Sequence, residues 1–354
     1  MRKIGIEDID DIALGSSLLG SGGGGDPYMG RLEAIAAVKK YGPVELLDID
    51  EVPDTWTVAP ICGVGAPSVS LEKGTNGVEY PKVRAMMERI LGRKLDAFLL
   101  SEAGGMNSMV PISAAARAGL PLINADGMGR AFPELQMVTW SMYGQSASPI
   151  GVADERGNTL LMHAATNKCG EDLCRGATVE MGGNISLACY GMTGAEAKAH
   201  SVAGTYTLCE NVGRILRRAR VVVVVGFFVF VFFGFLFFVF FLWFFVGLVV
   251  LGVGFLVVLV GFVGVVVVGF QNEFLIAECN GEVVCTAPDL IAMFDSETLT
   301  PITGEALKYG CRAIVLGIPC APQWRTPEGL ATVGPAVFGY ECVEFVPVEE
   351  RCKQ

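Results

Sequence analysis

Positive charge is the first thing that this sequence has little of. Its 354 residues include 26 Lys and Arg against 37 Asp and Glu, which gives a formal net charge of -11 at pH 7. A nucleic-acid-binding surface needs clustered Lys and Arg, because its affinity depends largely on contacts with phosphates. We therefore expect no nucleic acid among the partners of this protein.

Histidine is scarcer still, since His163 and His200 are the only two in the chain. The 11 cysteines are scattered and lack the two-residue spacing of zinc and redox motifs, so we expect most of them to be reduced and buried. A zinc site needs three or four ligands. A divalent metal held by one histidine with Glu102, Asp126 or a cysteine stays open, but no clear ligand motif supports it, and the cofactor is unknown.

We also expect no secretory signal. The first residues, Met1 to Asp11, are rich in acids and contain no apolar core segment. This composition favours a cytoplasmic location.

One stretch, Val221 to Phe270, lacks polar and charged residues altogether. It contains only Val, Phe, Gly and Leu apart from Trp243. It is long enough for about two membrane helices, yet it lacks the polar turn and flanking charges of such a pair. We therefore expect no membrane span. All five residue types can be encoded with G and T alone, so we interpret the stretch as anomalous low-complexity sequence, degraded or misread.

The rest of the chain is long enough for two domains. In residues 1–168, apolar runs expected as strands, such as Trp56–Val64 and Leu95–Leu100, alternate with helical patterns such as Ile6–Leu18 and Tyr80–Leu91. This alternation predicts a layered α/β domain with a largely parallel sheet.

Residues 169–354 end in a part that is rich in strand patterns. Glu273–Cys279 and Glu282–Thr286 flank Asn280-Gly281, a strong hairpin signal. Further strands are expected at Leu290–Phe294, Arg312–Ile318 and Cys342–Val346. These patterns predict a mainly-β C-terminal domain, either a barrel or a sandwich.

A glycine-rich loop, Leu19–Pro27, follows the first predicted helix. Glycines at this density let the backbone enter positive φ and approach a ligand closely, so we assign Gly22, Gly23 and Gly24 to substrate binding. Asp26 is expected to cap the next helix, whose positive N-terminus favours an anionic group. The spacing matches the dinucleotide fingerprint, but a helix and not a strand precedes it, which rejects that interpretation. A solvent-exposed hinge is the alternative.

Two polar motifs follow predicted strands. The first, Ser101 to Ser108, contains Glu102, Gly105 and Asn107; the second, Asn124 to Glu134, contains Asp126, Gly127 and Arg130. Ligands of open α/β sheets bind at the carboxyl ends of the strands, so we expect both motifs to face one crevice with Gly65-Ala66-Pro67.

The residue types in these motifs suit acid–base chemistry. Glu102 and Asp126 would form a pair of carboxyl groups that holds a proton or activates water. Asn107 would donate to a developing oxyanion. Arg130 would clamp a substrate carboxylate, with Gly105 and Gly127 beside the substrate. The alternative is structural: both acids cap helices and Arg130 pairs with Glu134.

Several motifs together resemble the S-methyl thiohydantoin desulfurase family, a group formerly uncharacterised and associated with hydantoinase and oxoprolinase proteins. They are the glycine loop at 19–27, Gly-Ala-Pro-Ser-Val before Glu72-Lys73, the Glu102 and Asp126 motifs, Met181-Gly-Gly, Gln271-Asn-Glu, Ala287-Pro-Asp-Leu-Ile, Trp324-Arg-Thr-Pro-Glu-Gly-Leu and Gly334-Pro-Ala-Val-Phe-Gly-Tyr. The resemblance runs from about residue 7 to 348, apart from the anomalous stretch. Ser21 departs from it, since Thr is expected there.

The resemblance implies a three-layer α/β/α N-terminal domain before the mainly-β C-terminal domain. It also implies hydrolysis of an S-methyl thiohydantoin, a small-molecule substrate, with release of methanethiol. A non-catalytic, ligand-binding or accessory subunit of a hydantoinase-type system is the alternative. We further expect a homo-oligomer and consider a hydantoinase-type protein partner.

Overall fold

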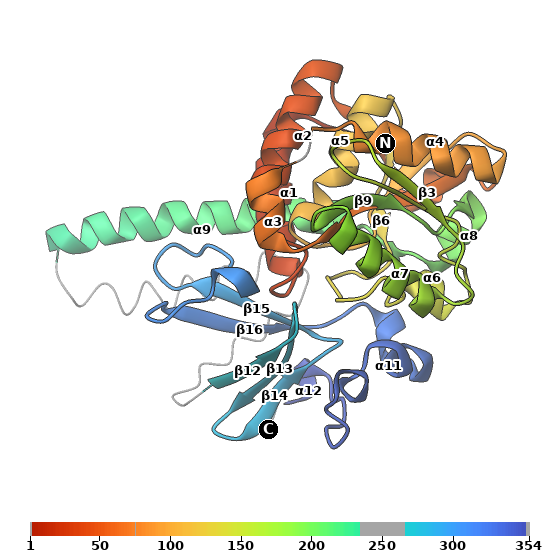
Figure 1. The fold of residues 1–354 in the computed structure, drawn as a ribbon. Helices are drawn as coiled ribbons and strands as arrows, with labels where there is room; N and C mark the ends of the chain where they lie inside the picture. Colours follow the sequence, from red (N-terminus) through yellow and green to blue (C-terminus); the bar gives the residue numbers. More distant parts are fainter. Residues whose placement is uncertain (1, 75, 234–265, 352–354) are drawn as a thin grey trace.

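The computed structural model describes residues 2–74, 76–233 and 266–351, and it has two parts (Figure 1). The first is a mixed α/β domain, and the second consists mostly of antiparallel strands. The predicted fold class is therefore confirmed. Residues 234–265 of the anomalous stretch lie outside the described residues, and within the described part no helix is long and apolar enough to cross a bilayer.

The large sheet is parallel at its centre, where β2, β5, β4 and β3 lie side by side, and antiparallel towards both edges. In spatial order its strands are β1 (Arg2–Ile4), β2 (Val44–Leu47), β5 (Leu122–Ile123), β4 (Ala97–Leu99), β3 (Thr57–Gly65), β9 (Asn184–Ala188), β7 (Ile150–Ala153) and β8 (Thr159–Met162), with β10 (Met192–Thr193) also paired to β3. The carboxyl ends of the parallel strands therefore meet at one edge.

Helices cover this sheet in layers (Figure 1). α5 (Val110–Ala118) packs on the parallel strands, α2 (Pro27–Tyr41) on α5, and α1 (Ile6–Leu19) between α2 and α9 (Thr205–Phe233). α7 (Asn167–Glu180) packs on β3 and β9. The remaining helices and short strands are α3 (Pro67–Lys73), α4 (Glu79–Leu91), α6 (Thr139–Met142), α8 (Gly194–His200), β6 (Ala125–Asp126) and β11 (Val202–Ala203).

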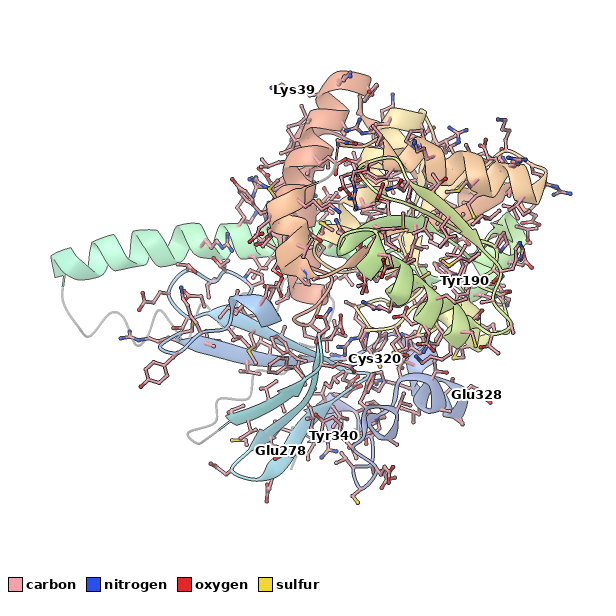
Figure 2. The ribbon with its side chains drawn as sticks, viewed as in Figure 1. Lys39, Tyr190, Glu278, Cys320, Glu328 and Tyr340 are labelled. Carbon is pink, nitrogen blue, oxygen red and sulfur yellow. The ribbon has the colours of Figure 1, made fainter. Side chains whose placement is uncertain are left out.

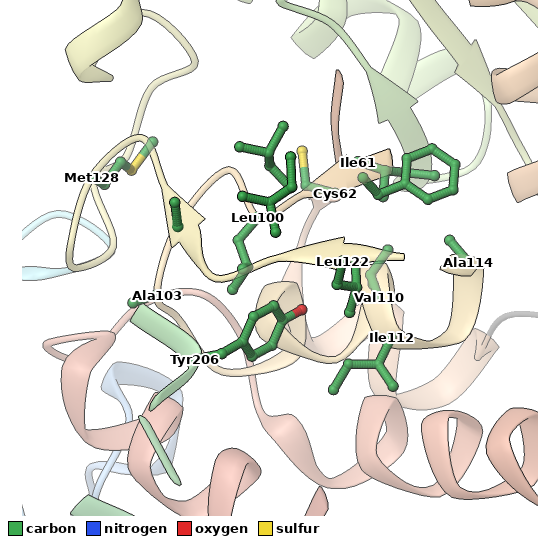
Figure 3. Close-up of a cluster of buried hydrophobic side chains, with 14 of the residues drawn as sticks. Ile61, Cys62, Leu100, Ala103, Val110, Ile112, Ala114, Leu122, Met128 and Tyr206 are labelled. Atoms are coloured by element: carbon green, nitrogen blue, oxygen red, sulfur yellow. The ribbon is translucent and has the colours of Figure 1, made fainter. Parts of the chain in front are cut away.

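Apolar side chains fill the space between these layers. Figure 3 shows Leu122 of β5 near Val110 and Ile112 of α5, all fully or nearly fully buried. Burial of such side chains stabilises a fold by roughly 1.5–3 kcal/mol each. This core fixes the strand ends from which the polar motifs emerge.

Residue 168 lies inside α7, and the chain after it still contributes to the large sheet, where β9 pairs with β3. The expected domain boundary at residue 168 stays a prediction. In space, the antiparallel part described below begins with β12.

The C-terminal part contains two small antiparallel sheets. One has β12 (Val266–Phe270), β13 (Phe274–Cys279) and β14 (Glu282–Thr286), and the other has β15 (Leu290–Asp295) and β16 (Ala313–Ile318). Asn280 and Gly281 form the predicted hairpin turn, with φ of 53° and 85°. α11 (Pro327–Val333) and α12 (Val348–Arg351) follow.

The strand expected at Cys342–Val346 is wrong. This segment begins in a turn in which the Val343 N–H donates to the Tyr340 carbonyl, and the Arg351 guanidinium donates to the Glu344 carbonyl. Its alternating apolar residues resemble a strand, but a strand also needs a neighbour for its backbone groups. Figure 2 shows Tyr340 and Glu278 in this lower part of the molecule, and Cys320 where the two parts meet.

The glycine-rich loop joins the two parts. Ser21, with φ of 49°, exchanges hydrogen bonds with the backbone of Ile291, donating to its carbonyl at 2.8 Å and accepting from its N–H at 3.0 Å. The Phe274 N–H donates to the Ser21 carbonyl at 2.6 Å. The loop is therefore held between the two parts, and the solvent-exposed hinge is wrong.

A candidate active-site cleft

A cleft with a cavity volume of about 100 Å³ lies at the carboxyl edge of the sheet. The α/β domain lines it with residues 24–26, 62–65, 101–102, 106–107 and 132–135 among others, and the C-terminal part contributes residues 272 and 273. The expected crevice therefore exists, and it brings together the glycine loop, the end of β3 with Pro67, and both polar motifs.

Glu102 lies in this cleft directly after β4 and is 6% exposed. Its Oε1 accepts a hydrogen bond of 2.7 Å from the Asn107 amide, whose own oxygen accepts from the Gly63 N–H at 2.8 Å. Burial raises the pKa of Glu102 to about 7, although the Asn107 amide and the Phe132 N–H favour the ionised form. Near neutral pH this carboxyl group can take up or release a proton.

Glu273 is the second acidic side chain at the bottom of the cleft, and it comes from the C-terminal part just before β13. It is 2% exposed, and its Oε2 has no hydrogen-bond partner. Burial first, and then the nearby Glu102, raise the pKa of Glu273 to about 8. Glu273 was not predicted from the sequence, although it stands in the Gln271-Asn-Glu motif, because the side chains around it depend on how the two parts dock.

Asp126 lies behind the cleft instead of lining it. It is fully buried, and it accepts hydrogen bonds of 2.8 Å each from the Ala103 and Gly129 N–H groups and the Thr205 hydroxyl. Burial raises the pKa of Asp126 to about 7 against these hydrogen bonds, and the charge of Asp126 in turn raises the pKa of Glu102. Asp126 therefore fixes the backbone next to Glu102, and the two carboxyl groups in the cleft lining whose pKa values are raised are those of Glu102 and Glu273.

Arg130 also lies outside the cleft. It is 0% exposed, and its guanidinium donates to backbone carbonyls of Ala131, Pro288, Asp289 and Phe274 over 2.7–3.2 Å. This position does not fit the expected role of a clamp for a substrate carboxylate, nor the alternative pair with Glu134. The guanidinium ties the second polar motif to the C-terminal part.

The predicted substrate-binding glycines divide in the same way. Gly24 lines the cleft, whereas Gly22, Gly23, Gly105 and Gly127 do not. A side chain at Gly105 would place its Cβ 1.6 Å from the Gly25 carbonyl oxygen, and one at Gly23 would place it 2.0 Å from Glu273 Oε1. These glycines let two loops and the Glu273 side chain pack against each other, so the close approach that they permit is mainly to protein.

Other side chains line the cleft without having been predicted, among them those of Cys62, Glu171 and Arg175. Burial raises the pKa of the Cys62 thiol to about 12, so this group is neutral at physiological pH. Glu171 accepts a hydrogen bond from Arg175 Nε at 2.5 Å and another from the Leu135 N–H at 3.0 Å. The signal that could have found the last two is their spacing of four residues on one helix.

Metal ligands do not gather here. Among the residues that the structure describes, no group of three or more His, Cys, Asp or Glu side chains is placed to hold a metal ion. His163 is exposed, and His200 stacks on Tyr143 with ring centroids 4.7 Å apart. The two histidines are absent from the lining of the cleft as far as the structure describes it.

This fold and cleft define a class of two-domain protein, in which a mixed α/β domain and an antiparallel C-terminal domain each supply a buried carboxyl group with a raised pKa to a shared cleft. The chain belongs to the S-Me-THD-like family: the N-terminal domain of this family matches residues 7–164, and its C-terminal domain matches residues 165–227 and 258–348. The suspected S-methyl thiohydantoin desulfurase family is thereby confirmed.

A solved structure has the same fold. The crystal structure of a protein from Chromobacterium violaceum, a structural genomics target, aligns with a TM-score of 0.81 at 22% sequence identity. The alignment covers 98% of this chain and 100% of the other. Among curated proteins no match to the chain was found.

Proposed function

We propose that this protein is a hydrolase of a hydantoin-like five-membered ring, which releases methanethiol from an S-methyl thiohydantoin. Family membership supports the substrate class. The observation that carries the reaction type is the placement of Glu102 and Glu273 in one cleft, with pKa values near 7 and 8. Two buried carboxyl groups whose pKa values lie near neutrality suit a base and an acid that work together.

The two groups divide the proton transfers between them. Glu102 takes a proton from water as the water oxygen adds to the ring carbon that bears sulfur, and Glu273 gives its proton to the ring nitrogen. When the tetrahedral centre collapses, the carbon–sulfur bond breaks, Glu102 returns its proton to the departing sulfur, and the new hydroxyl gives its proton to Glu273. Water and substrate thus become methanethiol and a hydantoin, and both carboxyl groups return to their starting state.

Asn107 and Asp126 act through Glu102. The Gly63 N–H fixes the orientation of the Asn107 amide, so that its NH₂ group points to Glu102. Asp126 holds the backbone at Ala103. Both are positioning residues in this proposal. Asn107 lies close to the reacting groups, but it orients Glu102 and does not donate to an oxyanion. A homo-oligomer, a hydantoinase-type partner and a cytoplasmic location remain further proposals.

The proposed function is tested with the purified full chain and S-methyl thiohydantoins. We expect enzyme-dependent methanethiol, with an equal amount of the corresponding hydantoin. In water enriched in oxygen-18, mass spectrometry should find one heavy oxygen at the new ring carbonyl. Absence of methanethiol from every such ring would reject the hydrolase.

The pH dependence follows from the roles of the two carboxyl groups. Glu102 must be ionised to accept a proton, so kcat/KM should rise as the pH increases through about 7. Glu273 must be protonated to donate, so kcat/KM should fall as the pH increases through about 8. The two limbs belong to the pair as a whole. The profile is measured from initial rates between about pH 5 and 10, in steps of roughly half a pH unit. A value of kcat/KM that continues to rise above about pH 8 would contradict the acid role of Glu273.

A further inference from the structure

We propose that the cleft selects rings with a neutral or cationic side chain and rejects rings whose side chain carries a carboxylate. This inference rests on the proposed function, because it concerns the substrate of the same site. It is opposite to the carboxylate clamp that the sequence suggested for Arg130.

Charge in the cleft is strongly one-sided. Among the residues that the structure describes, its lining includes a single basic side chain, Arg175, and five acidic ones: Asp26, Glu102, Glu134, Glu171 and Glu273. Glu305 also lies close enough to Asp26 to interact with it, and Lys168 lies 3.8 Å from Glu134. An anion entering this cleft would face more negative than positive charge, in surroundings where burial weakens screening by water.

The two arginines that could offset this charge are already engaged. Arg175 pairs with Glu171 through its Nε at 2.5 Å, and its NH2 group donates to the Pro133 carbonyl at 2.7 Å. Arg130 is fully buried among backbone carbonyls. Arg130 therefore offers no guanidinium fork to a substrate carboxylate, and two of the three guanidinium nitrogens of Arg175 already donate to protein oxygens.

Within the described structure, three buried polar atoms of the cleft lining have no hydrogen-bond partner, and each of them can accept a hydrogen bond. Two are Glu273 Oε2 and Asn184 Oδ1, in residues that are 2% and 7% exposed, and the third is the hydroxyl oxygen of Ser101, which can also donate. A buried acceptor without a partner is costly, so a ligand that donates N–H groups gains from satisfying it. Ring N–H groups and a cationic side chain are such donors, whereas a carboxylate is not.

The remaining walls suit a neutral side chain. Met29, Leu71 and Met106 are apolar residues in the lining. Thioether side chains adapt their shape to what they contact. An aliphatic substituent on the ring can therefore pack against this side of the cleft without meeting a charge.

The experiment compares three 5-substituted hydantoins of similar size, derived from leucine, lysine and glutamate. Binding to the full chain is measured by titration calorimetry at pH 7. We expect the glutamate-derived ring to bind at least about tenfold more weakly than the other two, since one extra like-charge contact in a partly buried site has an effect of this order. Equal or tighter binding of the glutamate-derived ring, or no binding of any ring, overturns the inference.

A double variant tests the cause. Asp26→Asn with Glu134→Gln removes two acidic groups from the cleft, and asparagine keeps the helix cap that Asp26 makes with the Tyr28 N–H. The affinity ratio between the leucine-derived and glutamate-derived rings should shrink severalfold. The matched control, Asp10→Asn with Glu297→Gln, removes the same charge from exposed ion pairs with Arg31 and Arg312. An equal shift in the control would assign the effect to net charge and reject the cleft as its cause.

The proposed function is tested separately, by measuring the methanethiol that the protein releases from the matching S-methyl rings. Discrimination against the glutamate-derived ring without methanethiol from any ring would support the selectivity and reject the hydrolase. Methanethiol release with preference for the glutamate-derived ring would support the hydrolase and reject the selectivity.

Discussion

Replacing Glu102 by glutamine is expected to lower kcat by about 10²–10⁴-fold, the usual contribution of general acid–base catalysis. Glutamine has nearly the same shape and can still accept the hydrogen bond that the Asn107 amide donates at 2.7 Å. It cannot take a proton from water. The fold should remain intact, because burial penalises the ionised form of Glu102 and the neutral amide avoids that penalty.

Methanethiol release under saturating substrate measures this loss, and circular dichroism checks the fold. Glu79→Gln is the matched control, since Glu79 is a buried glutamate on α4 that does not line the cleft in the described structure. If Glu102→Gln keeps the turnover of Glu79→Gln, then Glu102 is not the base, and the proposed mechanism is wrong.

Glu102 and Asn107 could be predicted because the information is local. A polar, glycine-bearing segment directly follows a strand whose residues are buried, and the carboxyl ends of parallel strands meet at one edge of a sheet. Both side chains line the cleft as expected. Whether they contact a substrate stays a prediction.

Glu273 and Asp126 show where local information ends. Glu273 approaches Glu102 only because the C-terminal part docks on the glycine loop, a contact across more than half of the chain. Asp126 stands in a polar motif like Glu102, but three neighbouring donors on different segments draw its carboxylate inward. Which of two similar acids faces solvent depends on packing, and motif position does not encode it.

For the glycine-rich loop, too, the sequence predicts local backbone geometry but not the long-range contacts. Its composition predicts positive φ, and Gly22, Gly24 and Gly25 have φ of 91°, 75° and 76°. Composition does not say what the bare backbone approaches, which here includes the first polar motif at Gly104. Likewise, the hairpin of β13 and β14 was expected from its Asn280-Gly281 turn, whereas the pairing of β9 with β3 joins residues far apart in sequence.

Replacing Arg130 by methionine is expected to lower the free energy of unfolding by about 3–5 kcal/mol, the cost of removing one partner from a buried charged network. The guanidinium donates to four backbone carbonyls, three of them in the C-terminal part, and it lies over the Phe132 ring at 4.7 Å. Methionine fills most of the volume but removes the guanidinium donor from all four buried carbonyls. Urea denaturation followed by tryptophan fluorescence measures the change, because Trp324 is buried near this junction and bonds to the Met128 carbonyl.

Arg93→Met, at an exposed position of the α/β domain, is the control for loss of one positive charge. A second readout separates the junction from general destabilisation. Arg130 lowers the pKa of Glu273 through its charge, so its removal should move the alkaline limb of the pH profile to higher pH in protein that is still folded. The prediction is contradicted if Arg130→Met is as stable as Arg93→Met and the alkaline limb does not move. In that case other contacts hold the two parts together, and burial and Glu102 alone set the pKa of Glu273.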